Sequence, residues 1–216
     1  MVLFIPVHIT QKADLYAVRL QLRQFRALRE RLPALQLIIT LDKDPTGYFN
    51  EKVLPAVLST ENCEFIDMRE SFARGIVAPT RKVIETVPDN VLLMRLTQDS
   101  YFTSIDALVK HIEDIGDSDI VGGRDVCSDI RHYLKQIGVS MPEERYAFVQ
   151  GNFILACAAI WRKHYLRIPP SVQHYCDDSI FSYLAEKDGC TLRFVNPAFW
   201  CHNRTRNVYD MEAIYA

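Results

Sequence analysis

The first third of the chain alternates between short apolar runs and longer amphipathic stretches. Residues 2–7 form an apolar run, which predicts a short buried strand. Over residues 14–32 apolar side chains recur at helical spacing with Arg and Gln between them, and Pro33 ends the pattern. Residues 35–41 form a second apolar run, which fits a strand buried on both faces. A strand, a helix and a strand in this order predict a right-handed parallel crossover.

The same alternation continues along the chain. Further expected elements are a short helix at 51–58, a strand at 63–68, a helix at 72–86, a strand at 91–96, a helix at 105–115, a strand at 119–121 and a helix at 129–137. Gly122 and Gly123 are expected to end the strand that precedes them. Beyond Pro142 we expect a strand at 146–149, helices at 153–165 and 179–186, and a strand at 191–195. This order predicts an α/β fold with a Rossmann-like, mixed and mostly parallel sheet flanked by helices.

The length and composition of the chain indicate the number of domains and the net charge. The chain has 216 residues, of which 49% are apolar, enough for one sizeable core and therefore one domain. Its 25 Lys and Arg residues oppose 27 Asp and Glu residues, and this net charge of −2 lacks the basic excess of non-specific nucleic-acid binding.

The cysteines and the apolar runs bear on the compartment. The six cysteines contain no Cys-x-x-Cys pair, and reduced thiols in a cytoplasmic protein are expected. No signal peptide and no run near the roughly 18 apolar residues of a membrane span is present. We therefore expect a cytoplasmic protein without a transmembrane segment, either free, peripheral to a membrane, or in the host cytoplasm if the protein is viral.

Polar residues follow three of the expected strands directly. They are Asp42-Lys43-Asp44, Thr97-Gln98-Asp99 and the segment 196–203. Ligands of open parallel sheets bind beyond the carboxyl ends of the strands, so these residues are candidates for a binding site. The alternative for any single aspartate here is a turn former or a helix N-cap.

The segment after the first strand lacks a phosphate-binding loop. Residues 7–11 contain neither Gly-x-Gly-x-x-Gly nor a Walker pattern, which argues against a dinucleotide or P-loop enzyme. A diphosphate held without such a loop needs another source of positive charge, commonly a divalent cation on carboxylates. Asp99 and His202 are the candidate ligands, and a carboxylate with an imidazole suits Mn²⁺ or Mg²⁺. A surface or buried structural histidine is the alternative for His202.

The order of these features resembles the small GT-A-type nucleotide-sugar glycosyltransferases over residues 2–203. The motifs are the aspartates after the second strand, the run 91–96 leading into Thr97-Gln98-Asp99-Ser100, Gly151-Asn152, Cys176-Asp177-Asp178-Ser179 and Ala198-Phe199-Trp200-Cys201-His202. The resemblance implies one GT-A-like domain over 1–216, with a donor-binding half at about 1–123 and an acceptor-side half at about 124–216. It also implies a hexosyltransferase-like enzyme that moves a sugar from a nucleotide donor, the co-substrate, to a hydroxyl group.

For the donor, the resemblance implies several contacts. The metal-binding Asp-x-Asp of the family falls on Thr97-Gln98-Asp99, where Thr97 replaces the first aspartate and weakens the expectation of strict metal dependence. Asp42 or Asp44 matches the acidic residue that contacts uracil and ribose, which implies a UDP-sugar. Gln98 is grouped with these donor contacts.

Two arginines are further donor candidates. Arg74 and Arg81 flank the helix that lies beside the donor in this family, where a guanidinium could pair with a phosphate. A solvated helix face is the alternative for both.

For the acceptor, the resemblance implies a glycine-lined pocket and a catalytic carboxylate. Gly151 and Asn152 match the segment that lines the acceptor pocket, with an ordinary turn before a helix as the alternative. Asp177 and Asp178 match the acidic pair at the start of a helix, and Asp178 is our choice for the base that takes the acceptor proton. Helix capping is the alternative for either carboxylate.

Two rival functions remain open from the sequence. A catalytically silent protein that binds a sugar nucleotide or a protein partner would explain Thr97. A sugar-1-phosphate nucleotidyltransferase has a related sheet, but it normally carries a glycine-rich basic loop after the first strand. With no added anchor or lectin domain expected in a chain of this length, we expect a soluble or cytosolic acceptor, and the residues leave open whether it is a glycan intermediate, a protein or a modified DNA base.

Overall fold

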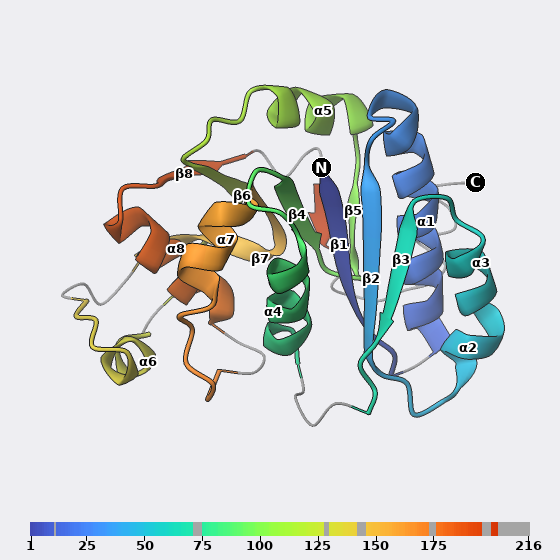
Figure 1. Cartoon of the computed structure of the whole chain (residues 1–216), viewed down its shortest axis with the longest axis horizontal. Helices are drawn as coiled ribbons and strands as arrows, with labels where there is room; N and C mark the ends of the chain where they lie inside the picture. Colours follow the sequence, from blue (N-terminus) through green and yellow to red (C-terminus); the bar gives the residue numbers. More distant parts are fainter. Residues whose placement is uncertain are drawn as a thin grey trace.

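A central sheet of seven strands organises the protein, in the order β3-β2-β1-β4-β7-β6-β8, and a separate small sheet pairs β5 with β9 (Figure 1). The structure is a computed structural model that describes residues 1–10, 12–70, 75–127, 130–141, 146–172, 176–195 and 200–202. None of the helices in these ranges is long and apolar enough to cross a membrane.

The elements alternate along the chain as the sequence pattern predicts. The strands are β1 (Val2–His8), β2 (Gln36–Lys43), β3 (Cys63–Asp67), β4 (Leu92–Leu96), β5 (Ser100–Phe102), β6 (Asp119–Cys127), β7 (Tyr146–Cys157), β8 (Thr191–Phe194) and β9 (Trp200–His202). The helices are α1 (Lys12–Arg31), α2 (Tyr48–Lys52), α3 (Leu54–Leu58), α4 (Val77–Thr86), α5 (Ile105–Glu113), α6 (Arg131–Gln136), α7 (Ala158–Tyr165) and α8 (Asp177–Lys187).

Strand direction brings the polar strand ends to one edge of the sheet. β1 runs parallel to β2 and β4, and β2 runs parallel to β3. β7 is antiparallel to both of its neighbours, β4 and β6, whereas β6 and β8 are parallel. The carboxyl ends of β1, β2 and β4 therefore lie together, at the lower edge of the sheet in Figure 1.

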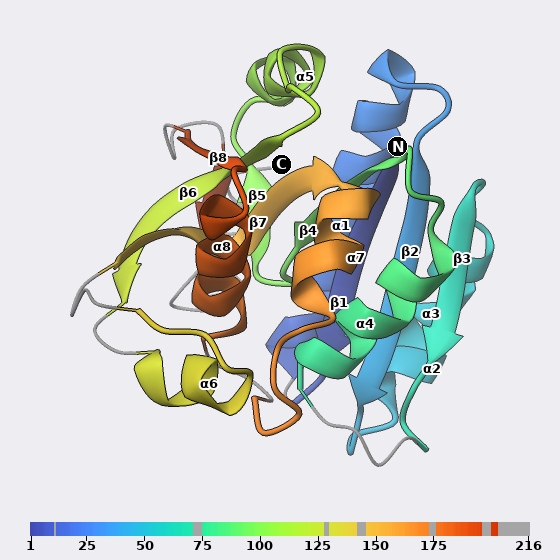
Figure 2. The same ribbon diagram turned by 60° about the vertical axis from the view of Figure 1, so that its left-hand side comes forward.

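Two layers of helices bury the two faces of the sheet (Figure 2). One face packs against α4, α7 and α8, and the other against α1, α3 and α5. The apolar spacing of α1 matches this burial, because Leu15, Val18, Leu22, Phe25 and Leu28 are each at most 4% exposed. Each such side chain contributes about 1.5–3 kcal/mol when buried.

Two strands of the second half are longer than the sequence pattern predicts. β6 does not end at Gly122 but runs on to residue 127, with a register shift between Gly122 and Arg124. A Cβ on Gly122 would lie 2.3 Å from the carbonyl oxygen of Phe153, so this glycine lets β7 approach closely. β7 likewise continues through the segment 153–157, which we expected to begin a helix. Apolar runs of this length fit a central strand as well as a helix, and pairing with β4 and β6 decides.

Smaller differences have local causes. The expected helix at 51–58 is two short helices, because Pro55 lies in the first turn of α3 and restarts the helix there. β5 and β9 were not expected, since each has only three residues and its partner is about a hundred positions away along the chain. The remaining core strands agree with the prediction to within a few residues.

Candidate active site

A cavity of about 390 Å³ opens at the carboxyl edge of the sheet. Its polar wall comes from His8, Asp42, Gly75, Thr97, Gln98 and Asp99. Ile76 and Pro79, at the start of α4, supply an apolar side. Three of the residues expected at the donor site, Asp42, Gln98 and Asp99, thus surround one cavity. This is the edge at which open α/β sheets bind their ligands.

Asp42 and His8 form a pair at the ends of β2 and β1. The Nδ1 atom of His8 lies 2.9 Å from Oδ1 of Asp42, and the backbone N–H of Gly75 donates to Oδ2 of Asp42 at 3.3 Å. The carboxyl of Asp42 is nearly buried, with 8% of its side chain exposed, whereas the imidazole is 39% exposed. The pair therefore presents an oriented imidazole to the cavity, backed by a carboxylate.

Gln98 holds the end of β1 against the end of β4. Its Oε1 accepts from the backbone N–H of His8 at 2.6 Å, and its Nε2 donates to the carbonyl of His8 at 2.8 Å. Both ends of this side-chain amide are thus used to fix the backbone that carries the imidazole. Gln98 lines the cavity, and its amide positions His8.

Two residues expected at the donor site lie elsewhere. Asp44 accepts from the N–H and the hydroxyl of Thr46, at 3.2 and 2.6 Å, and from the N–H of Phe49 at 2.9 Å. It therefore stabilises the turn before α2, which was the alternative for an aspartate at this position. Arg81 donates to the backbone carbonyl of Ile168 and does not line the cavity. Arg74 lies outside the described residues.

Thr97 and Asp99, at the two ends of the position expected for the Asp-x-Asp motif, lie in different surroundings. The hydroxyl of Thr97 lies 2.9 Å from that of Ser100, so the threonine stabilises the turn between β4 and β5. Asp99 lines the cavity. Ser100 pairs with His202 in the small sheet, which places the backbone of His202 next to the segment that carries Asp99. The side chain of His202 is outside the described part of the structure.

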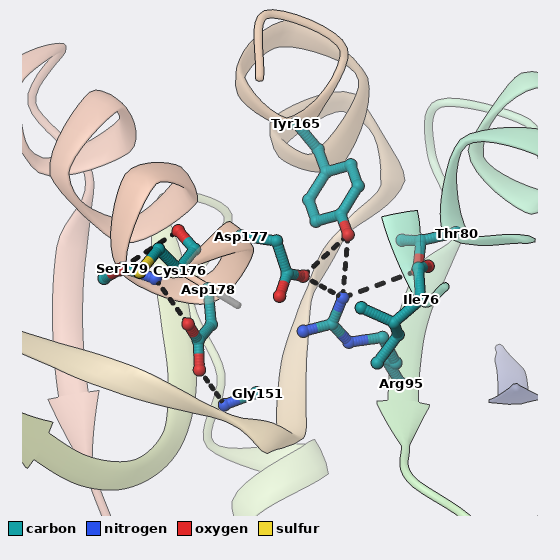
Figure 3. Close-up of polar contacts among 9 residues, drawn as sticks. All are labelled: Ile76, Thr80, Arg95, Gly151, Tyr165, Cys176, Asp177, Asp178 and Ser179. Carbon is teal, nitrogen blue, oxygen red and sulfur yellow. Dashed lines mark hydrogen bonds and ion pairs between the residues drawn. The ribbon is translucent and has the colours of Figure 1, made fainter. Parts of the chain in front are cut away.

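Gly151 and Asp178 meet at the second group of polar residues (Figure 3). The N–H of Gly151, in β7, donates to Oδ2 of Asp178 at 2.7 Å, and Oδ1 of Asp178 accepts from the N–H of Ser179 at 2.8 Å. A Cβ on Gly151 would lie 2.8 Å from the same Oδ2. Only glycine fits this contact, and Gly151 is within a strand instead of in a turn before a helix.

Asp177 is buried beside Asp178 and makes two polar contacts through one carboxylate oxygen. Its Oδ2 accepts from Nη1 of Arg95 at 2.6 Å and from the hydroxyl of Tyr165 at 2.7 Å (Figure 3). Arg95 is 0% exposed and Asp177 is 4% exposed. The α8 N-cap, Cys176, makes no side-chain capping bond and has the left-handed φ of 67°. Capping therefore does not explain Asp177, which serves as the partner of a buried cation.

The electrostatics of the pair set Asp178 apart from an ordinary carboxyl. Burial raises the pKa of Asp178, the adjacent charge of Asp177 raises it further, and Arg95 with two backbone N–H groups lowers it, leaving the pKa at about 7. Burial is the largest single influence on Arg95 and disfavours its charge, but Asp177, Tyr165 and Asp178 together outweigh it and raise the pKa of the guanidinium. A carboxyl that titrates near neutral pH can both accept and release a proton.

Asn152 connects the two groups through its backbone. Its carbonyl accepts from the N–H of Thr97 at 3.0 Å, which ties β7 to the end of β4. Its side chain is 6% exposed, and neither its amide nitrogen nor its amide oxygen has a partner among the described residues. The start of α4 also borders both groups, because Pro79 lines the cavity and Thr80 lies 3.4 Å from Nη1 of Arg95.

Sequence reasoning did not single out His8, Arg95 or Tyr165. The signal for Arg95 was a charged residue inside the otherwise apolar run at 91–96, which is rare unless the charge is paired. His8 ends the first strand directly, at the edge where ligands bind. Tyr165 has no local signal, because its role depends on how α7 packs against α8.

Comparisons with known proteins bear on the fold. No protein-family model matches the sequence, and no curated protein matches it. Among solved structures, the mannosyltransferase PcManGT from Pyrobaculum calidifontis, in complex with GDP-Man and Mn²⁺, is 12% identical with a TM-score of 0.65. That similarity covers 98% of this chain and 60% of the mannosyltransferase, so the chain spans less than two thirds of that protein's length.

Two further structures show the same likeness. The galactosyltransferase LgtC, in complex with donor and acceptor sugar analogues, is 16% identical with a TM-score of 0.53, over 91% of this chain and 74% of LgtC. A Bacillus anthracis protein assigned as a glucose-1-phosphate thymidylyltransferase is 11% identical with a TM-score of 0.61, over 99% of this chain and 95% of that one. The chain has a GT-A-like fold, as the sequence resemblance implied, and the fold is shared by nucleotide-sugar glycosyltransferases and nucleotidyltransferases.

Proposed function

We propose that the protein transfers a sugar from a nucleoside diphosphate sugar to a hydroxyl group of an acceptor. The observation that carries this proposal is the juxtaposition of two polar sites, the cavity at the ends of β1, β2 and β4 and the Asp178 carboxyl held against Gly151. α4 and the Thr97 to Asn152 backbone contact connect them. The cavity suits a nucleotide, and the Asp178 carboxyl can accept a proton.

The nucleoside is expected in the cavity. The Asp42 carboxylate can accept hydrogen bonds from base N–H and ribose hydroxyl groups, and the His8 imidazole offers a ring beside it. Ile76 and Pro79 offer an apolar surface. On the resemblance of Asp42 to the family's uracil and ribose contact, we propose a UDP-sugar as the donor. The GDP-Man complex of the similar mannosyltransferase makes guanosine the base to test against it.

The transfer is proposed to invert the sugar. The acceptor oxygen attacks the anomeric carbon while the bond from that carbon to the diphosphate breaks, and the diphosphate leaves with the electron pair. Asp178 takes the proton of the acceptor hydroxyl, for which a pKa of about 7 is suitable. Gly151 supports the step by fixing the carboxylate with its N–H and, because it has no Cβ, by letting the carboxylate approach the strand closely.

We also propose a divalent cation at this site, held by two protein ligands. Among the described residues no group of three or more His, Cys, Asp or Glu side chains is placed to hold a metal. Asp99 and His202 lie on adjacent backbone segments, and a carboxylate and an imidazole suit Mn²⁺ when diphosphate oxygens complete the shell. We propose that these two residues hold Mn²⁺ or Mg²⁺, which would offset the charge of the departing diphosphate.

The metal proposal makes a direct prediction. Mn²⁺ should strengthen binding of UDP in calorimetry, and Asp99→Ala and His202→Ala should each remove that enhancement without weakening metal-free binding. Identical titrations of the unmodified protein with and without Mn²⁺ would contradict it, and Thr97 would then mark a metal-independent site.

A panel of nucleotide sugars tests the proposed function. We expect UDP-sugars to raise the melting temperature in the presence of Mn²⁺, since a ligand at a hundred times its dissociation constant adds about 2.7 kcal/mol of stability. Slow hydrolysis of the same donor should follow, because water can replace the missing acceptor. Binding without hydrolysis would favour a silent sugar-nucleotide-binding protein. No shift with any nucleotide sugar would overturn the proposal.

A sugar-1-phosphate nucleotidyltransferase is the second candidate. The near-complete mutual coverage with the Bacillus anthracis protein favours it. The segment after β1 opposes it, since His8-Ile9-Thr10-Gln11 offers no glycine-rich loop. Release of pyrophosphate from a nucleoside triphosphate and a sugar 1-phosphate would select this alternative.

A further inference from the structure

A buried arginine lies under the candidate catalytic carboxylate. Arg95 stands in β4 and its side chain is 0% exposed, beside the rings of Trp161 and Tyr165, whose centroids are 5.5 and 5.6 Å from its guanidinium carbon. Its Nη1 atom contacts Asp177 at 2.6 Å and the Tyr165 hydroxyl at 3.0 Å. Its Nε and Nη2 atoms have no partner among the described residues.

The unpaired half of this guanidinium faces Gly151 and Asp178. The Nη2 atom of Arg95 and the Oδ2 atom of Asp178 lie 2.9 and 2.8 Å from the point that a Cβ on Gly151 would occupy. In Figure 3 all the dashed lines of Arg95 start at Nη1, and none reaches its other nitrogen atoms. Leaving buried N–H donors unpaired is costly, so their presence beside a carboxylate calls for a reason.

We propose that Arg95 is a positioning residue for Asp178, and that its guanidinium, facing the carboxylate past Gly151, favours the ionised form of Asp178 that can accept a proton. The role of that ionised form rests on the proposed function, in which Asp178 takes the acceptor proton. The contacts among Arg95, Asp177, Gly151 and Asp178 do not depend on it.

Asp177 and Arg95 act on Asp178 in opposite directions. The charge of Asp177 disfavours a second carboxylate beside it, whereas Arg95 favours one. Among the described residues, the other titratable groups beside the pair are Cys176 on α8 and Tyr165 on α7, and burial raises the pKa of each. Arg193 of β8, which also packs against α8, is paired with Asp119 instead.

These opposite signs give a test that a structural role would not pass. Protein labelled with ¹³C at the aspartate carboxyls is titrated by NMR without any donor, and Asp178→Asn assigns the signal. We expect the unmodified carboxyl to titrate near pH 7. Arg95→Met, which keeps the length and removes the charge, should raise that midpoint by about 1 pH unit or more, and Asp177→Asn should lower it by a similar amount.

The outcomes separate charge from packing. If Arg95 only fills space, both variants loosen the site and move the midpoint the same way, toward the ordinary value of 3.8, and this result overturns the inference. If Arg95→Met does not fold, Arg95→Gln, which keeps a planar polar end and removes the charge, takes its place, and a midpoint that stays or falls is again contrary. Arg31→Met, which removes the cation of an exposed pair with Asp106, is the matched control and should leave the midpoint unchanged.

Failure of this test and failure of the proposed function are distinguishable. The titration needs neither donor nor acceptor, so its result stands if no nucleotide sugar binds. Conversely, suppose that UDP-sugars bind while the unmodified protein, Arg95→Met and Asp177→Asn all show the same midpoint. The donor site would then stand, and the proposed role of Arg95 would be wrong.

Discussion

The two polar regions of the molecule are built on opposite physical principles. Around the cavity, His8 and Asp42 stand at strand ends, and 39% of the imidazole is open to solvent. Around Asp178, the charges of Arg95 and Asp177 are removed from water altogether. The first arrangement leaves polar groups available to a ligand, and the second uses them on one another. In the proposed function, the first region binds the donor and the second holds the charge state of Asp178.

The energetic consequences differ in the same way. A solvent-exposed ion pair contributes at most about 1 kcal/mol, whereas removing one partner of a buried pair costs about 3–5 kcal/mol. Substitutions around the cavity should therefore change affinity and leave folding nearly intact. Substitutions of Arg95 or Asp177 should change stability as well as chemistry. Asp178 is the informative residue, because it adjoins the buried network without being part of the ion pair.

The largest expected effect is on turnover. Asp178→Asn should lower the transfer rate by about 10² to 10⁴, because the amide cannot take the acceptor proton, while donor affinity stays nearly unchanged. The asparagine keeps the size of the side chain and one oxygen for the Gly151 N–H. The transfer rate is measured with an acceptor that the unmodified protein glycosylates. Donor affinity is measured by calorimetry.

The control for this prediction lies at the other end of the same helix. Asp188→Asn removes a carboxylate from the C-cap of α8 and should leave the rate unchanged. If Asp178→Asn transfers sugar normally, the base lies elsewhere or the enzyme retains configuration. If Asp177→Asn is inactive and Asp178→Asn active, the assignment within the pair is reversed.

The next effect is on donor affinity and compares two aspartates of one strand end. Asp42→Asn should weaken UDP binding about 10- to 100-fold, since a hydrogen bond to a charged group contributes roughly 1.5–3 kcal/mol. Asp44→Asn should lower the melting temperature, because its oxygens fix the turn before α2, without changing affinity. Equal affinities in both variants would remove Asp42 from the donor site.

Gly151→Ala tests the contact between the regions. The added Cβ would lie 2.8 Å from Asp178 and 2.9 Å from Arg95, so the carboxylate or the strand must shift. We expect a loss of about 1–3 kcal/mol in the free energy of unfolding, measured by urea denaturation. Gly116→Ala is the control, because its Cβ would meet only the Asp119 side chain, at 3.2 Å. Equal losses in the two variants would show that Gly151 is not a tight contact.

The sequence predicts the open region better than the buried one, for a physical reason. Strands alternate with helices by period, and polar residues at parallel strand ends must share an edge, so Asp42, Gln98 and Asp99 could be placed together from local patterns. Choosing between Asp42 and Asp44 needed coordinates, because both follow the same strand and only the fold of the turn separates them.

The buried region depends on contacts distant in sequence. Arg95, Tyr165 and Asp177 come from three elements, and no local spacing relates them. The resemblance to a family singled out Gly151, Asp177 and Asp178. It did not predict that Gly151 lies within a strand or that Asp177 pairs with a buried arginine. The extension of β7 through residues 150–157 was missed for the same reason, since pairing with β4 and β6 selects strand over helix there.

The last expected effect is on the pH dependence of stability, and it separates Asp178 from the rest of the protein. The pKa of its carboxyl is about 7 in the folded protein against 3.8 ordinarily, so between these values the folded state binds the proton more tightly. Its contribution to stability is therefore full below about pH 4 and is lost as pH rises through 7.

His164, whose pKa is lowered to about 4 by burial, acts in the opposite sense as pH rises from 4 to 6.5, so the total curve alone does not isolate Asp178. The difference between the unmodified protein and Asp178→Asn does, because His164 is common to both. From denaturation at pH 5 and pH 8, we expect Asp178→Asn to gain stability relative to the unmodified protein at the higher pH. Parallel curves would mean that Asp178 titrates as an ordinary carboxyl, and the contrast between an open binding region and a buried charge-holding region would then lose its main support.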